Sequence, residues 1–280
     1  MEKIKRAIEE SKRQQTECVG QAQVASEPVD TPVSSEAEAS HDMTCITYEQ
    51  TRVVKLNPEH LAKNRIVAIN KNDHLSLGFD ILRTQVIEKM KKKGWHTIAV
   101  TSPTPGCGKS VISINLAMSI AHHTDKTAML IDFDLRRPSV ARYLGLSSGP
   151  SMNDVLSGDA TIAQALVNPG LDRLVILPTA MPVKHSSEVL SSQKVSNIIK
   201  DVSERYPERI VMFDTTPLLG SDDAMNLMSQ VDCVLVVVGN GMVSKSELME
   251  SMRYVDNKKL LGTVLNKSES PQASKWYYDY

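Results

Sequence analysis

The chain has 280 residues, of which 41% are hydrophobic, so it can bury a full core, and we expect one main domain with a tail. Its 32 basic residues balance 33 acidic ones, and this balance gives no indication of a nucleic-acid partner. The longest apolar runs are far shorter than the about 20 residues that span a bilayer, and the first residues lack the apolar core of a secretory signal. These patterns favour a cytoplasmic protein.

The start of the chain differs in composition from the rest. Residues 1–17 open with MEKIKRAIEESKRQQ, which predicts a helix that either docks on a partner or is simply solvated. Residues 18–50 are rich in Ser, Ala, Glu, Pro and Val without a sustained period, which is typical of a flexible linker. The four cysteines form no C-x-x-C pair and the seven histidines no H-x-x-x-H spacing, so neither disulfides nor a zinc site is indicated.

From His96 onward, short apolar runs alternate with helix-like segments, as in a mostly parallel α/β sheet with helices on both faces. The two clearest helices are predicted from Lys109 to about His122 and from Glu188 to about Tyr206, with Pro207 as the stop. The predicted strands are 97–101, 127–132, 174–178, 209–214, 233–239 and 260–266.

The stretch TSPTPGCGKS at 101–110 ends like a phosphate-binding loop, although Pro103 stands where G-x-x-x-x-G-K-[ST] has its first glycine. It follows a predicted strand and opens a predicted helix. In that context Gly106 and Gly108 let backbone N–H groups approach phosphates, Lys109 supplies a charge to the β and γ phosphates, and the Ser110 hydroxyl suits Mg²⁺. The alternative is a chance G-K-S at the start of a helix.

Three aspartates follow apolar strands, at the sheet edge where Mg²⁺ on a bound nucleotide would lie. Asp214 ends RIVMFD, and Asp132 and Asp134 lie two residues apart in MLIDFDLRRP, so we expect the latter pair to share a face. Clustered carboxylates repel one another unless cations lie between them. The alternatives are an ordinary turn residue at Asp214 and, for the pair, a solvated turn in which Arg136 and Arg137 are the counter-ions.

The G-K-S loop, NLA at 115–117, LIDFDLRRP and a strand ending in FDTTP together resemble the bacterial tyrosine kinases of exopolysaccharide and capsule synthesis. The chain is most similar to the soluble autokinases encoded with exosortase-type polysaccharide systems. The resemblance runs from about residue 75 to residue 280, and the double-aspartate strand is its most specific element. It implies a P-loop NTPase fold with ATP and Mg²⁺ as cofactors. Loops of the type TSP.PGEGKS are common in this family, so Pro103 is ordinary there.

On this resemblance the P-loop tyrosine kinase domain spans 51–268, and Asp132 is the residue nearest the acceptor hydroxyl. An asparagine that leaves a strand, such as Asn266, either reads adenine or simply makes a turn. The implied catalytic residues are Lys109, Asp132, Asp134 and Asp214; the implied metal ligands are Ser110, Asp132 and Asp214; and the implied nucleotide contacts are Pro105, Gly106, Cys107, Gly108, Lys109, Ser110, Val111 and Asn266.

The segment 269–280 ends in WYYDY, whose Tyr277, Tyr278 and Tyr280 resemble the family's autophosphorylated cluster. Chain ends are usually exposed, so these tyrosines are not expected in the core; the alternative is a tail that docks on its own domain. The implied acceptor is the tail of a neighbouring subunit. A membrane activator of the chain-length-determinant type would recruit the protein to the inner membrane, and a tyrosine phosphatase would reset the tail.

Two departures and two rival functions accompany this reading. The family's ring-forming helix reads E-x-x-R-x-x-R, but LGFDILR has Leu77, Asp80 and Arg83 at those places, which puts a ring-shaped homo-oligomer in question. Cys107 stands where glutamate is frequent and places a thiol beside the phosphates. One rival is a partition or division-site ATPase, whose signature lysine is Thr104 here. The other is a nucleotide-binding regulator of a polysaccharide exporter without catalysis.

Overall fold

The computed structural model describes residues 51–71, 73–122, 126–147, 149–206 and 208–268. The predicted N-terminal helix (1–17), linker (18–50) and tyrosine-rich tail (269–280) lie outside these residues. No helix in the described ranges combines the length and the apolar composition needed to cross a bilayer.

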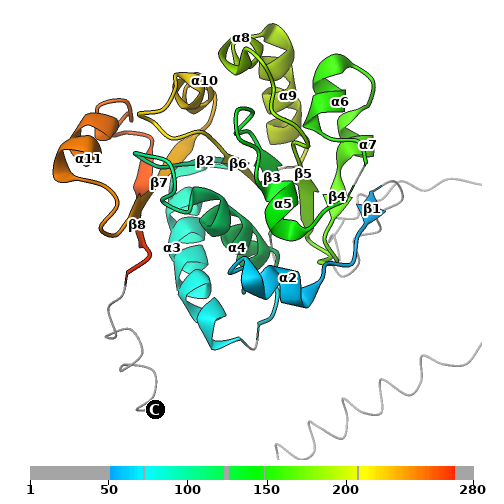
Figure 1. Ribbon diagram of the computed structural model, residues 1–280, viewed down its shortest axis with the longest axis horizontal. Helices are drawn as coiled ribbons and strands as arrows, with labels where there is room; N and C mark the ends of the chain where they lie inside the picture. The colour runs from blue at the N-terminus through cyan, green and yellow to red at the C-terminus, as the bar shows by residue number, and fades with distance from the viewer. Residues whose placement is uncertain (1–50, 72, 123–125, 148, 207, 269–280) are drawn as a thin grey trace, which may run out of the picture. The chain divides into compact units, whose positions relative to one another are not determined.

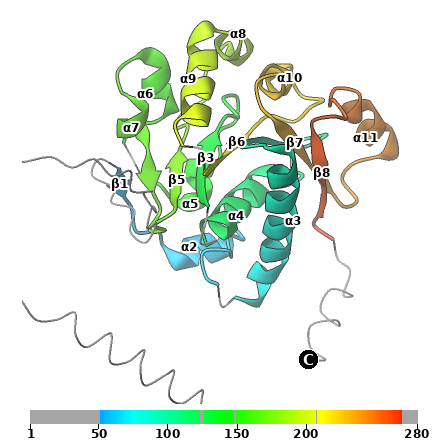
Figure 2. The same ribbon diagram turned by 180° about the vertical axis from the view of Figure 1, so that it is seen from behind.

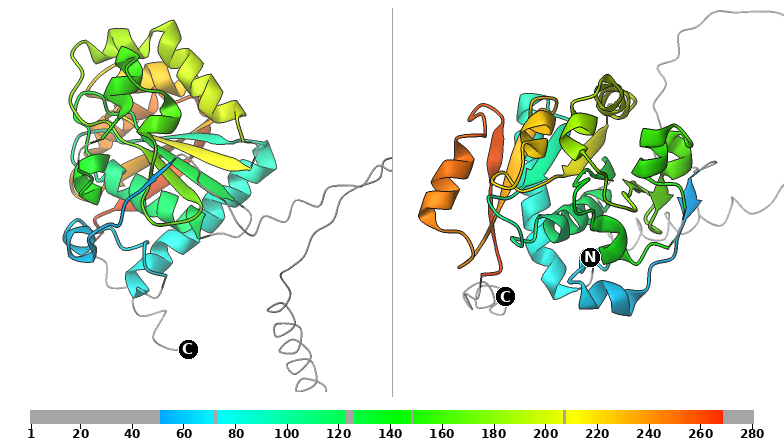
Figure 3. Two further views of the ribbon diagram at one scale, coloured as in Figure 1. Left: turned by 90° about the vertical axis from the view of Figure 1, so that its right-hand side faces the viewer. Right: turned by 45° about the horizontal axis from the view of Figure 1, so that its top comes forward.

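The described residues form a sheet of eight strands in the order β1-β4-β5-β3-β6-β2-β7-β8. All neighbours pair in parallel except β4 and β5, which are antiparallel. Figures 1 and 3 show β1 and β8 at the two ends of the sheet. The strands are β1 (Arg52–Val53), β2 (Thr97–Thr101), β3 (Thr127–Asp132), β4 (Val167–Asn168), β5 (Leu174–Leu177), β6 (Arg209–Asp214), β7 (Cys233–Gly239) and β8 (Leu260–Asn266).

All six predicted strands are present, and five of them have the predicted bounds, while β5 ends one residue earlier at Leu177. They were predictable because parallel strands buried on both faces read as continuous apolar runs. Every residue of β2, β3 and β5 is buried. The sequence did not predict β1 and β4, since two residues are too few to show a period.

Helices cover both faces of the sheet, as the turned view in Figure 2 also shows. Alternate strand residues point to opposite faces, so Leu130 of β3 packs in one core layer and Ile131 in the other. The first layer holds α2 (Pro58–Lys63), η1 (His74–Ser76), α3 (Leu77–Lys93), α4 (Lys109–Ala121) and α5 (Val140–Leu144). The other helices are α6 (Met152–Ser157), α7 (Ile162–Ala165), α8 (Ser186–Leu190), α9 (Gln193–Glu204), α10 (Asp223–Met228) and α11 (Lys245–Met252).

The predicted helix at 188–206 is wrong in one respect, because the structure divides it into α8 and α9. The break lies at Ser191 and Ser192. Ser192 has extended backbone angles (φ −74°, ψ 150°), and its hydroxyl accepts a hydrogen bond from the Val195 N–H, so it is an N-cap that starts a second helix. The predicted helix from Lys109 is confirmed as α4, which ends one residue before His122.

Candidate functional site

The loop between β2 and α4 has the conformation of a phosphate cradle. Gly106 and Gly108 adopt left-handed backbone angles, with φ of 83° and 91°, which glycine tolerates best. A Cβ atom at Gly106 would lie 3.2 Å from Met242 Cε, and one at Gly108 would overlap the side-chain amide of Asn266. Both positions therefore favour glycine for the backbone angle, and Gly108 also for space. Gly108 is the N-cap of α4, so the first N–H groups of this helix face the loop.

Lys109 is surrounded by carboxylates. Its Nζ lies 2.7 Å from Asp134 Oδ2 and 3.8 Å from Asp214 Oδ1, and its side chain is only 11% exposed. Burial acts to lower the pKa of Lys109, but the charges of Asp214 and Asp134 more than offset this, so its pKa is raised. The ammonium is thus charged and serves as the counter-ion of the aspartates.

Asp132 and Asp134 have different surroundings. Asp132 is fully buried, and its Oδ2 accepts hydrogen bonds from the backbone N–H groups of Ser139 (2.8 Å) and Val140 (2.9 Å). Burial, with the nearby charge of Asp214, raises the pKa of Asp132 to about 8. Asp134 follows the end of β3 and contacts Lys109. Asp134, and not Asp132, lines a cavity beside the phosphate loop.

Asp214 offers an open ligand position for a cation. It lies beside Asp132 in the register of β6 with β3, and its Oδ1 is 3.3 Å from the Ser113 hydroxyl. Burial raises the pKa of Asp214, although the positive charge of Lys109 acts to lower it. Its Oδ2 is buried and receives no hydrogen bond of normal geometry from the described residues, although the Ser110 hydroxyl lies close enough to favour the ionised form.

These donors fit Mg²⁺. It prefers oxygen ligands and is usually held by one or two carboxylates together with substrate phosphates, which matches Asp214 and the adjacent Ser110 hydroxyl. In the described residues no cluster of three or more His, Cys, Asp or Glu side chains is arranged to hold a metal by itself. Nucleotide phosphates and water are the usual remaining ligands of a Mg²⁺ ion held by one or two carboxylates.

The alternative in which Arg136 and Arg137 neutralise the aspartate pair does not match the structure. Arg136 Nε lies 3.0 Å from Asp223 Oδ2 of α10, and 3.0 Å from the Ser186 hydroxyl. Arg137 reaches Asp134 through its backbone N–H, at 3.0 Å from Oδ1. Asp132 and Asp134 are 0% and 4% exposed, so they do not lie in a solvated turn.

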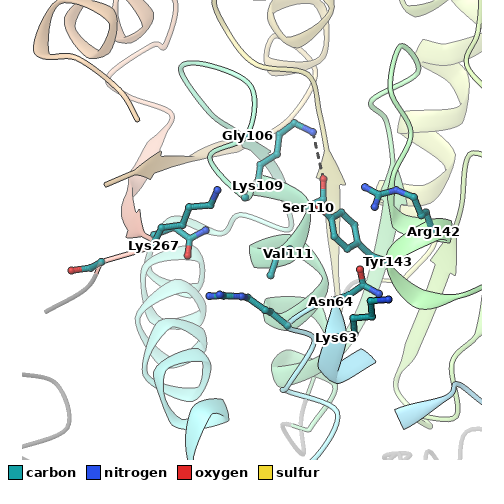
Figure 4. A pocket seen from close by; sticks show the side chains of 13 residues that line it. Lys63, Asn64, Gly106, Lys109, Ser110, Val111, Arg142, Tyr143 and Lys267 are labelled. Atoms are coloured by element: carbon teal, nitrogen blue, oxygen red, sulfur yellow. Dashed lines mark hydrogen bonds between the residues drawn. The ribbon is translucent and has the colours of Figure 1, made fainter. Parts of the chain in front are cut away.

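Two cavities meet at Lys109 and Gly106. The first, of about 770 Å³, contains Ser110, Val111 and Asn266 and extends toward the end of α2. Figure 4 shows Lys267 on one side of it, Arg142 and Tyr143 on the other, and Lys63 and Asn64 below. The second, of about 350 Å³, is lined by Pro105, Asp134, Arg136, Arg137, Thr216 and Pro217 among others. The loop thus separates a larger cavity from a smaller one that is lined in part by Asp134.

Comparison with known proteins identifies the family. The model for the AAA domain family matches residues 95–264. A tyrosine-protein kinase named ptk from Acinetobacter johnsonii is 26% identical over 74% of this chain and 28% of its own length. The tyrosine-protein kinase YwqD of Bacillus subtilis is 27% identical over 75% of this chain and 86% of its own length. The chain belongs to the AAA domain family and, within it, to the bacterial tyrosine kinases.

A solved kinase domain supports this family assignment. The kinase domain of VpsO is 28% identical, with a TM-score of 0.60 over 69% of this chain and 96% of that domain. Several curated relatives are much longer than the region they share with this chain, which spans 24% to 28% of their length. The AAA domain match implies nucleotide binding by the P-loop.

Cys107 and Asn266 are joined within this candidate site. Asn266 ends β8 and donates a hydrogen bond from Nδ2 to the Cys107 carbonyl at 2.9 Å, so the amide predicted to read adenine also supports the loop. The Cys107 thiol is fully buried and lies 3.6 Å from the Thr104 hydroxyl. The thiol therefore points into the core and not toward the phosphates.

Sequence reasoning missed the role of Asn115, which had entered only as part of the NLA motif. This residue of α4 is fully buried. Its Oδ1 accepts from the N–H groups of Val67 (2.8 Å) and Ala68 (2.9 Å), while its Nδ2 donates to the carbonyls of Arg65 (3.0 Å) and Val111 (2.8 Å). The segment after α2 is thereby tied to the helix of the phosphate loop. The available signal in the sequence was an asparagine within the largely apolar helix KSVISINLAMSIA.

Arg83, the residue that this chain keeps from the predicted ring-forming motif, makes its contacts within the domain. Arg83 Nη1 lies 2.7 Å from Asp80 Oδ1 and 3.2 Å from the Ser119 hydroxyl, and that hydroxyl donates to Asp80 at 2.7 Å. This network joins α3 to α4 within one chain. The surviving arginine of the family motif is thus occupied inside the domain.

Proposed function

We propose that the chain is an ATP-dependent protein-tyrosine kinase that phosphorylates tyrosines of its own C-terminal segment. The observation that carries this proposal is the position of Lys109 between two cavities, one beside the phosphate loop and one beside Asp134. A donor and an acceptor of a phosphoryl group need such an arrangement, because catalysis of this reaction rests on positioning and charge neutralisation. Curated relatives that are named tyrosine-protein kinases support the same activity.

The first cavity takes the nucleotide. The N–H groups of the loop at Gly106 and Gly108 bind the β and γ phosphates, and Ser110 and Asp214 hold Mg²⁺ with them. When bound, Mg²⁺ would supply positive charge that offsets the negative charge of the phosphates. Lys109 then exchanges Asp134 for the γ phosphate as its main partner. Asn266 and Val111 border the same cavity.

The acceptor tyrosine enters the second cavity. Its volume of about 350 Å³ lies within the usual range for small-molecule sites, and Pro105 and Pro217 give it apolar walls. Once Lys109 has turned to the phosphates, the Asp134 carboxylate is free to orient the tyrosine hydroxyl and accept its proton late in the transfer. Free tyrosine has a pKa of about 10, so early proton removal is not required.

Asp132 is buried and does not line the second cavity. Its buried carboxyl is bound to the first N–H groups of α5 and lies next to Asp214. Since its pKa is raised to about 8, it carries little charge near neutral pH until a cation approaches, and binding of Mg²⁺ favours its ionised form. Asp132 is therefore a ligand or supporting group for the cation in this proposal, and Asp134 is the closer group to the hydroxyl.

The acceptors are Tyr277, Tyr278 and Tyr280, presented by a neighbouring subunit. Each phosphate adds about −1.5 to −2 charges at neutral pH, so a modified tail is repelled by the aspartates and leaves. In this proposal the kinase regulates chain length and export of an exopolysaccharide, as a cytoplasmic protein of the exosortase-associated type. A membrane chain-length-determinant protein recruits and activates it, and a tyrosine phosphatase removes the phosphates.

Mapping of phosphopeptides after incubation with Mg·ATP tests the acceptor assignment. We expect phosphate on the last peptide and loss of most of the signal when Tyr277, Tyr278 and Tyr280 are all replaced by Phe. Undiminished phosphotyrosine in that triple variant, at other positions, would refute the tail as the main acceptor.

A further inference from the structure

The first cavity is more basic than binding of the β and γ phosphates requires. Besides Lys109 it is lined by Lys63, Arg65, Arg142 and Lys267, and no acidic side chain from the described residues lines it. The loop glycines and Lys109 occupy one end, so the α phosphate and the nucleoside of a bound nucleotide must occupy the rest. A cationic lining there indicates side chains that bind this part of the ligand.

Two of these cations have a strained backbone. Among the described residues, the non-glycine residues with positive φ are Arg65 (59°), His185 (54°) and Lys267 (60°), and two of the three line this one cavity. The left-handed region is unfavourable for residues with a Cβ atom and is occupied mainly by glycine or asparagine. Strain of this kind persists only where surrounding structure enforces it, and it is concentrated at functional sites.

The position of Arg65 is one where glycine is the usual residue. Arg65 follows the C-cap of α2, its N–H donates to the Ala62 carbonyl at 3.0 Å, and the Ile66 N–H donates to the Leu61 carbonyl at 2.9 Å. This pair of bonds is the Schellman arrangement, which favours glycine at the left-handed place. Arg65 is exposed, so burial of its side chain does not offset the cost of the left-handed backbone.

Buried or partly buried asparagine amides attach both strained residues to the phosphate loop. Asn115 of α4 holds the Arg65 carbonyl at 3.0 Å. Asn266, the residue before Lys267, donates to the Cys107 carbonyl in the loop at 2.9 Å and accepts the Asn240 N–H on its own carbonyl at 2.8 Å. The backbone at Arg65 and the residue before Lys267 are therefore tied to the loop and helix that would hold the phosphates, and both side chains line the same cavity.

We propose that Arg65 and Lys267 bind the α phosphate and nucleoside of the nucleotide, and that the chain tolerates left-handed strain at both positions in order to present these side chains. A guanidinium can stack on the face of a base, and an ammonium pairs with phosphate as a compact charge. The inference rests on the proposed use of ATP, but it concerns nucleotide binding and not phosphoryl transfer.

Glycine substitutions test the proposal, because they remove strain and side chain together. Arg65→Gly and Lys267→Gly should raise the melting temperature of the nucleotide-free protein by about 2–4 °C each, yet weaken binding of Mg·ADP by at least about tenfold in calorimetric titration. His185→Gly is the matched control: it should release comparable strain at the start of α8, outside this cavity, and leave Mg·ADP affinity unchanged. Arg65→Gln keeps the strained backbone without the charge, and we expect unchanged melting with weakened binding.

A second probe locates the contact on the ligand. Binding of inorganic tripolyphosphate with Mg²⁺, which lacks a nucleoside, should change less than twofold in Arg65→Gly. Mg·ADP affinity equal to the wild type in both Arg65→Gly and Lys267→Gly would overturn the proposal. Equal weakening of Mg·ADP and tripolyphosphate binding in Arg65→Gly would overturn it as well, because Arg65 is assigned to the nucleoside. Weakened Mg·ADP binding in a protein that forms no phosphotyrosine would support this inference and refute the kinase function, so the two failures are distinguishable.

Discussion

Replacement of Asn115 by alanine is the most informative single change for the fold around the site. The substitution removes hydrogen bonds to the N–H groups of Val67 and Ala68 and to the carbonyls of Arg65 and Val111. Asn115 is 0% exposed and Ala68 is 2% exposed, so water does not readily replace the lost partners. The segment after α2 would lose its attachment to the phosphate-loop helix.

The size of the effect follows from this inventory. A buried group left without its hydrogen-bond partner costs about 1–3 kcal/mol, and Val67 is only partly buried, so we expect a total loss of about 2–4 kcal/mol. For a domain of this size, about 2–4 °C of melting temperature corresponds to each kcal/mol, which predicts a decrease of about 4–16 °C. Mg·ADP affinity should fall as well, because the backbone of Arg65 is no longer fixed.

Thermal and urea unfolding of the full chain measure this change. Asn115→Asp keeps the two acceptor bonds but turns an oxygen toward the carbonyls of Arg65 and Val111, so it should lower the melting temperature at least as much as alanine does. Asn197→Ala is the control, since Asn197 is an exposed residue of α9 and its loss should change stability by less than about 0.5 kcal/mol. A melting temperature of Asn115→Ala within about 1 °C of the wild type would refute the reasoning that this buried amide holds the segment in place.

Three further predictions concern titration, assembly and thiol access. Because the pKa of Asp132 is raised to about 8 in the fold, its contribution to the free energy of unfolding is full below about pH 4 and is lost as the pH rises to about 8. Without Mg²⁺, Asp132→Asn should therefore make the free energy of unfolding, measured in urea, decline less over this pH range. An unchanged pH profile would count against the raised pKa. Arg83→Ala should lower the free energy of unfolding by about 1–3 kcal/mol, because its contacts with α4 are lost. The mass measured by light scattering should stay the same, and a change in mass would show that Arg83 joins subunits. Cys107 and Cys233 are fully buried, and burial raises the pKa of Cys233 to about 12. In a variant whose other two cysteines are replaced by serine, the native protein should therefore react with thiol reagents far more slowly than the unfolded protein. Equal reaction rates would contradict the burial of these two thiols.

Much of the sheet was predictable from apolar runs, because buried parallel strands leave a continuous signal in the sequence. The break between α8 and α9 was not predicted, although two consecutive serines at 191 and 192 are residues that favour helix starts over helix interiors. The short strands β1 and β4 depend on tertiary pairing alone, since their two-residue length carries no pattern of its own.

The candidate site was predictable residue by residue but not in its contacts. Lys109, Asp134 and Asp214 come together because β3, β6 and β2 are neighbours in the sheet, an order that local sequence patterns do not determine. The difference between Asp132 and Asp134 depends on where β3 ends and where α5 begins. Arg65 gave no sequence signal, since only backbone geometry reveals its strain.

The most direct test of the kinase function is incubation of the purified full chain with Mg·ATP, with phosphotyrosine measured over time beside Lys109→Met. Lys109 neutralises Asp134 in the structure and would neutralise phosphate during transfer, so the wild type should accumulate phosphotyrosine and the variant should form almost none. Circular dichroism and thermal melting establish that the variant is folded. Phosphotyrosine formed at the wild-type rate by folded Lys109→Met would contradict the account at its centre.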